Sequence, residues 1–171
     1  MSEEYVTLLR WVAVEEARRK VEEEWKRLRE REEQLLRVEA ALRGARARPP
    51  SFKPELPQGY LDALRRLVVQ SVYGRWNRER RASTLAEISA DVKKAIRRLM
   101  ALGEWPRGWG LPSKRTIDRR VNELHRPEEC GQDPPPLLCV KPGVYMPHPA
   151  RFEDEARRRV EEAVAALRSG R

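Results

Sequence analysis

A seven-residue hydrophobic repeat runs through the first 44 residues of the chain. Its main row consists of Val14, Val21, Leu28, Leu35 and Leu42. A strict heptad repeat is typical of helices that pack lengthwise against other helices, because it keeps the apolar side chains along one seam. Ser2 is a suitable N-cap with acidic residues after it, and Gly44 is a stop signal. The pattern predicts one long charged helix over residues 2–43.

The second row of the same repeat is only partly apolar. It reads Trp11, Arg18, Trp25, Glu32 and Glu39, whereas a strong two-stranded coiled coil keeps both rows apolar. We favour self-association of the chain through this helix, which would make the protein a homodimer. Packing of the helix against its own domain, a free solvated helix and contact with another protein remain as alternatives.

The length of 171 residues suits one or two small domains. The sequence has no apolar run of about 18 residues that would span a membrane. Acidic residues stand near the N-terminus where a secretory signal carries basic ones, so we expect a cytoplasmic, nucleoid-associated protein. The excess of arginine over lysine and the scarcity of asparagine, glutamine and cysteine resemble thermophile usage, archaeal in our expectation. A GC-rich genome gives a similar arginine bias.

The net charge of +9 is concentrated in the middle of the chain. Residues 45–149 contain 20 basic and 11 acidic side chains, a net +9, while residues 1–44 carry −1 and residues 150–171 carry +1. A localised basic surface is expected of a protein that binds a polyanion such as nucleic acid. Basic segments also occur in proteins that bind no nucleic acid, so charge alone leaves the partner open.

Residues 45–59 form a proline-rich basic linker. Proline fixes φ and removes a backbone donor, so this segment is predicted to be an extended, semi-rigid connector. Arg46 and Arg48 are candidates to follow a phosphate backbone, and a plain solvated linker is the simpler interpretation.

Two helices are predicted after the linker. The first begins at Tyr60 and ends near Gly74. Thr84 and Glu87 have the spacing of a capping box, in which each satisfies a free backbone donor of the other, and the helix that follows stops at Gly103.

Residues 103–112, GEWPRGWGLP, contain too much glycine and proline for a regular helix. We expect Trp105 and Trp109 of this loop to pack against the domain, with contact to a partner as the alternative.

Residues 113–124 are predicted to form a short amphipathic helix capped by Ser113. Ile117, Val121 and Leu124 share one face. The opposite face carries Lys114, Arg115, Asp118, Arg119 and Asn122. An ordinary arginine-rich surface helix has the same pattern.

A loop over residues 126–136 precedes two short β-prone runs at 137–146. Pro142 and Gly143 fit the central positions of a type II turn, which places Lys141 near the tip of a β-hairpin. A C-terminal helix is predicted over residues 150–169. Its apolar face comprises Phe152, Ala156, Val160, Ala163, Val164 and Leu167.

This order of elements resembles the winged helix-turn-helix family of prokaryotic DNA-binding proteins, over residues 60–147. The resemblance implies a mainly α fold with a small β-hairpin, preceded by a long coiled-coil-like helix and followed by a C-terminal helix. Residues 113–124 look like the recognition helix, and the hairpin at 137–146 takes the place of the wing. The family joins its second and third helices by about three or four residues. About ten intervene here, so either the second helix ends early or the loop is an insertion.

The resemblance also implies a double-stranded DNA site. A recognition helix enters the major groove with its N-terminal side chains at the base edges. The candidates for base contacts are Lys114, Arg115, Asp118, Arg119 and Asn122, since arginine pairs with guanine and asparagine with adenine. Ser113 and Thr116 are candidates to hold phosphates at the helix start. The expected phosphate contacts elsewhere are Lys141 of the wing and Arg78, Arg80 and Arg81 ahead of the second helix.

Other kinds of site are weakly indicated. His125, Cys130, Cys139 and His148 are possible zinc ligands, but they lack the close pair of a structural zinc site. Disulfides are rare inside cells, so we do not favour a bond between Cys130 and Cys139. We expect Cys139 to be a thiol buried in the hairpin and Cys130 to be a thiol in the loop. The chain has no recognisable phosphate-binding loop, nucleophile elbow or zinc-protease motif. We therefore expect neither enzyme activity nor a cofactor.

The sequence favours a dimeric, sequence-specific transcription regulator, in which the N-terminal helix, the C-terminal helix or both would join the two subunits. A plasmid or virus replication or partition factor would use the same domain. A winged-helix adaptor that binds only proteins is the alternative from another class. An adaptor needs an apolar patch over the helix at 113–122.

Overall fold

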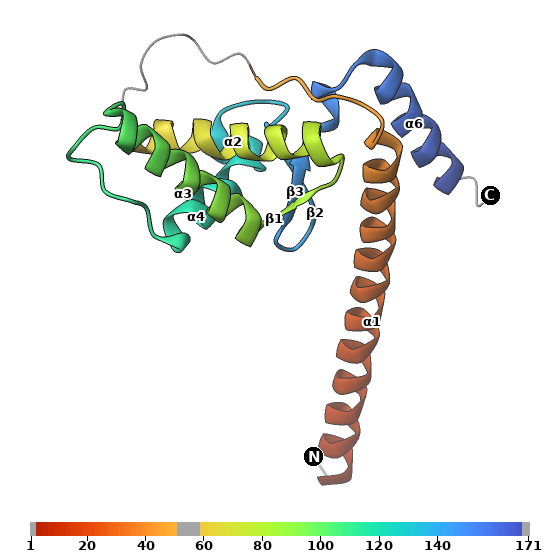
Figure 1. Ribbon diagram of the computed structural model, residues 1–171. Coiled ribbons are helices and arrows are strands. Elements are labelled where there is room, and N and C mark those ends of the chain that lie inside the picture. Colours follow the sequence, from red (N-terminus) through yellow and green to blue (C-terminus); the bar gives the residue numbers. More distant parts are fainter. Residues whose placement is uncertain (1–2, 51–58, 169–171) are drawn as a thin grey trace.

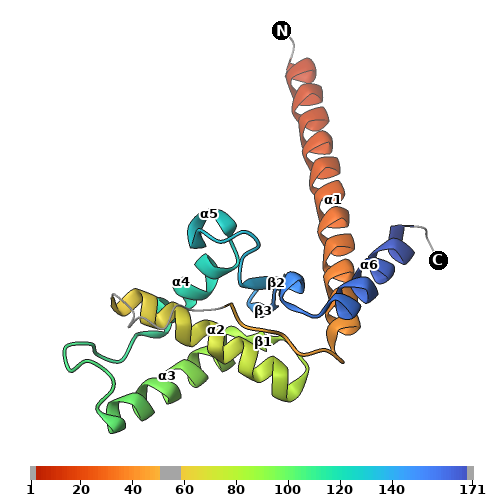
Figure 2. The same ribbon diagram turned by 90° about the horizontal axis from the view of Figure 1, so that it is seen from above.

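The computed structural model describes residues 3–50 and 59–168, which form mostly helices and one small antiparallel sheet. The elements, in chain order, are α1 (Glu3–Leu42), α2 (Tyr60–Glu79), β1 (Ser83–Thr84), α3 (Leu85–Leu102), α4 (Lys114–Leu124), α5 (Pro127–Cys130), β2 (Leu137–Lys141), β3 (Val144–Pro147), the 3₁₀ turn η1 (Pro149–Arg151) and α6 (Asp154–Arg168). Helices α2 to α5 and the sheet form a compact domain, while α1 projects from it with α6 along its base (Figures 1 and 2).

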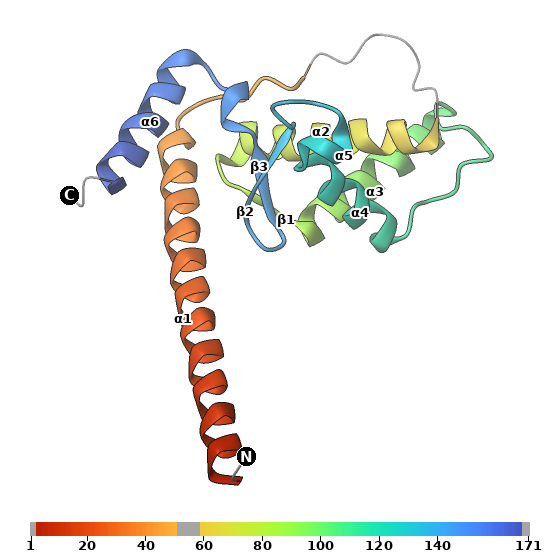
Figure 3. The same ribbon diagram turned by 180° about the vertical axis from the view of Figure 1, so that it is seen from behind.

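The long N-terminal helix is confirmed over its described residues, and the predicted cap Ser2 lies outside them. The C-terminal turns of α1 pack against α6 and β2. Val38 and Leu42 are buried there and Leu35 is half-buried. The rest of the helix extends into solvent (Figure 3). The alternative in which the helix packs against its own domain is therefore correct only for the last turns of α1.

Helix α2 is longer than predicted, because it continues through Gly74 to Glu79. The prediction of an end near Gly74 is wrong. The apolar face that buries Val72 and Tyr73 continues to Trp76, which is fully buried, so packing outweighs the cost of one glycine inside a helix. The helix ends instead at Arg80, whose left-handed backbone (φ 55°) places its N–H on the Trp76 carbonyl.

The described part of the linker, up to residue 50, is attached to the domain. Ala47 is buried and pairs with Phe152 in an isolated β-bridge. Its N–H and C=O both bond to the Asn77 side chain, at 3.0 and 3.1 Å. A solvated linker is therefore the wrong description of this stretch. Residues 51–58 lie outside the described part of the chain.

Helices α3 and α4 follow the sequence prediction closely. The capping box of Thr84 and Glu87 is present, and α3 continues to Leu102 with Gly103 as its left-handed cap (φ 72°). The long connection to α4 is thus real and does not arise from an early break of α3. Trp105 of this connection is buried, and its ring and the Trp109 ring both pack edge-on against Tyr60.

The predicted hairpin is confirmed and carries a third strand that the sequence prediction missed. The strand order is β1-β3-β2, with Cys139 opposite Tyr145 and Ser83 on the other side of Tyr145. Gly143 has φ 77°, which is the left-handed conformation that the predicted type II turn requires.

Two details after α4 correct the sequence prediction. The predicted loop at 126–136 contains the one-turn helix α5. The C-terminal helix begins at Asp154, so Phe152 precedes it rather than lying on its face, and packs edge-on against Trp76 at 5.5 Å between ring centroids. Within α6, Ala156 is buried and Val160, Ala163 and Val164 are half-buried, while the Leu167 side chain lies outside the described residues.

Candidate nucleic-acid interface

Helix α4 is fixed in one orientation by its cap and its buried face. The Ser113 hydroxyl accepts from the Thr116 N–H at 3.1 Å, which satisfies one of the free donors of the first turn. Ile117 and Val121 are fully buried against α2 and α3. Because one face is held in the core, the opposite face has a defined direction toward solvent.

Three cations stand on that outer face. Lys114 and Arg115 are exposed, and neither forms an ion pair with another described residue. The Arg119 side chain is 78% exposed, and its Nε lies 3.7 Å from the Glu123 carboxylate. We call these three residues the α4 basic face.

One carboxylate, Glu123, serves three guanidinium groups. It lies 2.6 Å from Arg120 Nη2 and 3.4 Å from Arg65 Nη2, in addition to its longer contact with Arg119. Arg120 is buried and belongs to this packing arrangement. Glu123 therefore cannot neutralise Arg119, and the α4 basic face keeps its positive charge.

The hairpin is tied to both α3 and α4. The Leu85 N–H donates to the Gly143 carbonyl at 3.0 Å, which holds the β2–β3 turn against the start of α3. The Tyr145 hydroxyl donates to Asn122 Oδ1 at 2.7 Å, which joins the hairpin to α4. Burial raises the pKa of Tyr145 to about 12, so this donor keeps its proton at neutral pH.

These ties bring the hairpin turn into line with the N-terminal ends of α3 and α4. All three lie along one edge of the domain in Figures 1 and 3. Lys141 at the turn is exposed. The edge therefore joins the α4 basic face to a further cation on a separate element.

Asn122 and Asp118 lie on the side of α4 that faces the hairpin. The amide oxygen of Asn122 is occupied by Tyr145, and the half-buried Asp118 is close enough to Tyr145 to raise its pKa. Asn122 thus takes part in fixing the hairpin, a role that its spacing on α4 did not reveal. His125 stacks near Tyr145 at 5.5 Å. Burial lowers the pKa of His125, so it adds no charge at pH 7.

The hydroxyls of Ser113 and Thr116 are 2.8 Å apart and bonded to each other. With the Thr116 N–H already on Ser113, this pair is engaged in capping α4. It leaves less hydrogen-bonding capacity for a phosphate than the sequence suggested.

The arginines ahead of α3 are mostly engaged within the chain. Arg80 donates to the Ala45 carbonyl at 2.6 Å. Arg81 lies 2.7 Å from Glu79 and 2.6 Å from Glu87. Arg81 therefore has carboxylate partners for its charge, and the Arg80 guanidinium is held by a backbone carbonyl, which distinguishes both from the α4 basic face.

Arg78 belongs to a second basic surface that the sequence analysis did not single out. It lines a hollow of about 410 Å³ with Lys94, Arg98 and Asp91, between α2 and α3. Arg97 is also exposed on α3. The signal was available in the KKAIRR run at 93–98, where basic residues recur four apart on a helix.

The cysteines and histidines form no site among the described residues. Cys130 and Cys139 are both free thiols and half-buried. No group of three or more potential metal ligands, including the set with His125 and His148, is found in residues 3–50 and 59–168. Within the same residues, none of the helices is both long and apolar enough to cross a membrane.

Comparisons with protein-family models, with curated proteins and with solved structures find no match for this chain. We therefore infer function from the α4 basic face, the hairpin and their surroundings alone.

Proposed function

We propose that residues 59–147 form a winged helix-turn-helix domain that binds double-stranded DNA. The order α2, β1, α3, α4, β2, β3 and the sheet order β1-β3-β2 support this assignment. In such a domain the second recognition element is the hairpin beside the helix that enters the major groove.

The observation that carries the proposal is the excess positive charge of the α4 basic face, where one carboxylate, Glu123, is shared among Arg119, Arg120 and Arg65. Lys114, Arg115 and Arg119 point to solvent from a helix whose other face is in the core, and Lys141 lies on the same edge. Arginine in the major groove makes bidentate contacts to guanine, while lysine contacts to phosphate add affinity without sequence preference. We assign Arg115 and Arg119 to base edges, and Lys114 and Lys141 to phosphates.

The structure gives less support to an adaptor function at this surface. The outer face of α4 carries no large exposed apolar side chain among the described residues, and a protein-binding patch would need one. A transcription regulator is the simplest role for such a domain. A replication or partition factor would use the same DNA-binding face. The DNA site that the domain selects would distinguish such a factor from a transcription regulator.

The test is binding to mixed-sequence duplex DNA over a series of salt concentrations. The wild-type chain is compared with Arg115→Ala/Arg119→Ala and with Arg27→Ala/Arg158→Ala. The control pair removes the same charge from exposed positions on α1 and α6. We expect the affinity to fall with salt by roughly 0.9 in log units per phosphate neutralised.

The α4 variant is expected to bind at least about ten-fold more weakly at low salt, since it removes two cations from the DNA-binding face. The control should bind like the wild type. An equal loss of affinity in both variants would show that binding depends only on the net charge of the chain. Absence of binding at low salt would exclude the proposed function.

A further inference from the structure

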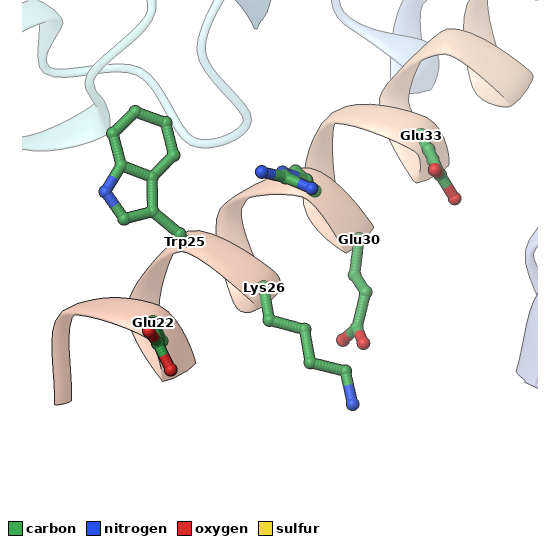
Figure 4. Close-up of a pocket in the computed structure, with 6 residues that line it drawn as sticks. Glu22, Trp25, Lys26, Glu30 and Glu33 are labelled. Carbon is green, nitrogen blue, oxygen red and sulfur yellow. The ribbon is translucent and has the colours of Figure 1, made fainter. Parts of the chain in front are cut away.

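The projecting part of α1 carries an apolar row that no described residue covers. Trp11, Val14, Val21, Trp25 and Leu28 are between 51% and 64% exposed. Figure 4 shows the Trp25 indole standing off the helix, with Lys26 and Glu30 directed to the other side. Two exposed tryptophans and three aliphatic side chains in one line are an unusual surface for a helix with nothing packed against it.

The same row is covered further along the helix. Leu35 is half-buried and Leu42 fully buried, where α6 and β2 pack against α1. The heptad seam is therefore continuous, but its own chain supplies a cover only at the C-terminal end. The remaining stretch, residues 10–34, spans about three and a half heptads, which is a length over which a heptad pattern indicates a coiled coil.

We propose that the occupant of this seam is the α1 helix of a second copy, in parallel and in register. With Trp11 and Trp25 at a positions and Val14, Val21 and Leu28 at d positions, the flanking e and g positions carry complementary charges. In a parallel pair, g of one helix faces e of the next heptad on the other. Arg10 then meets the partner subunit's Glu15, and Glu24 meets the partner subunit's Arg29.

The four side chains of these pairs are free to form them. Arg10, Glu24 and Arg29 are exposed and Glu15 is half-buried, and no ion pair is found between any of them and another described residue of the chain. In the remaining g-to-e pairs, Ala17 faces the partner subunit's Glu22 and Arg31 faces the partner subunit's Leu36. The parallel register therefore contains no pair of like charges at the g and e positions.

Two a positions within this stretch carry charges, Arg18 and Glu32. The Arg18 Nε lies 3.2 Å from Glu22 on the same helix, which partly balances its charge at the seam. Polar residues at a positions fix the register and the number of strands of a coiled coil, with some loss of stability.

The coil has a consequence for the proposed function. A parallel pair holds two domains at the same end of the coil and so presents two α4 basic faces. That consequence rests on DNA binding, whereas the coil itself does not.

The coil is tested by sedimentation equilibrium of the full chain without DNA. We compare the wild type with Val21→Glu, at the seam, and Val12→Glu, an exposed valine on the same helix but outside both rows. We expect a dimer for the wild type and Val12→Glu, and at least ten-fold weaker association for Val21→Glu. A wild-type monomer, or equal effects of the two substitutions, would overturn the proposal.

The orientation is tested by exchanging charges. Glu24→Arg places like charges at the parallel g-to-e pair and should weaken the dimer, while Glu24→Arg/Arg29→Glu restores a complementary pair and should restore association. Glu23→Arg, outside the seam, is the control for the added charge. In an antiparallel dimer g faces g and e faces e, so failure of the double exchange to restore association would exclude the parallel arrangement.

The two proposals fail separately in these experiments. A monomer that still binds DNA through Arg115 and Arg119 refutes only the coil. A dimer that does not bind DNA refutes only the proposed function.

Discussion

The domain at residues 59–147 and the projecting part of α1 are both arginine-rich and helical, yet they leave different groups without partners. In the domain, the apolar faces of α2, α3 and α4 pack into one core, and the ion pair found for the α4 basic face is with Glu123, which also contacts Arg65 and Arg120. In residues 10–34 of α1 the charges of both signs are balanced along the helix, and the apolar row lacks a cover.

The difference shows what each region lacks in isolation. A basic face with excess positive charge is satisfied by a polyanion, and an uncovered heptad seam by another helix. Under the two proposals these arginine-rich regions therefore bind different kinds of partner, because the periodicity places the apolar and charged residues differently relative to the fold.

The largest expected effect is on the stability of the fold, and it compares substitution of a tryptophan in the domain with substitution of a tryptophan in α1. Trp76 is fully buried, packs on Phe152 and donates to the Ala45 carbonyl at 3.1 Å. Trp76→Ala should lower the free energy of unfolding by about 3–5 kcal/mol, because it leaves a large cavity. Urea unfolding monitored by circular dichroism measures this change.

Trp25→Ala is the matched substitution in α1, where the side chain is 60% exposed. It should leave unfolding of the monomer almost unchanged, within about 0.5 kcal/mol. At protein concentrations that favour the dimer it should become destabilising. A large, concentration-independent loss from Trp25→Ala would contradict the comparison.

A smaller effect concerns the bond that holds the hairpin to α4. Tyr145→Phe removes the donor to Asn122 and should lower the free energy of unfolding by about 1 kcal/mol. Tyr73→Phe removes the same group from a buried bond to the Pro136 carbonyl at 2.8 Å and should have a similar effect on stability. We expect only Tyr145→Phe to weaken DNA binding as well, because it frees the hairpin from α4.

Equal DNA affinities of the two phenylalanine variants would show that the position of the hairpin does not matter for binding. Titration of both variants with duplex DNA at one salt concentration, next to urea unfolding, separates stability from binding.

Local signals in the sequence were sufficient for most of the fold. The heptad row predicted α1, the capping box placed the start of α3, and the Ser113 cap with its apolar spacing placed α4. Gly143 was correctly assigned to the turn. Each of these features depends on residues within about four positions of one another, which is the range in which helix periodicity, caps and turns act.

The failures involve contacts between distant parts of the chain. Helix α2 passes through Gly74 because Trp76 is packed between Ala45 and Phe152, which are remote in sequence. The two-residue strand β1 exists only through its pairing with β3.

The candidate site shows the same limit. The cations of α4 could be predicted from its amphipathic pattern. The engagement of Asn122 by Tyr145, and of Arg80 by the Ala45 carbonyl, could not, since neither partner lies nearby in the sequence.

The smallest expected effect concerns the dependence of stability on pH that the cap of α3 confers, where Glu87 forms an ion pair with Arg81. A hydrogen bond from Arg81, with further bonds from Thr84, lowers the pKa of Glu87 from its usual 4.5 to about 2. A carboxyl group whose pKa is depressed in the folded state stabilises it fully above the unfolded value, and this contribution is lost as the pH falls from about 4.5 to about 2. Glu87→Gln should therefore reduce the loss of stability over this range, as measured by urea unfolding at pH 5, 4 and 3.

Glu30→Gln, an exposed position on α1, is the matched control and should follow the wild type. Parallel curves for the wild type and Glu87→Gln down to pH 3 would mean that the cap contributes nothing to acid sensitivity. Arg81 would then be only loosely held by Glu87, and it would return to the set of cations open to DNA.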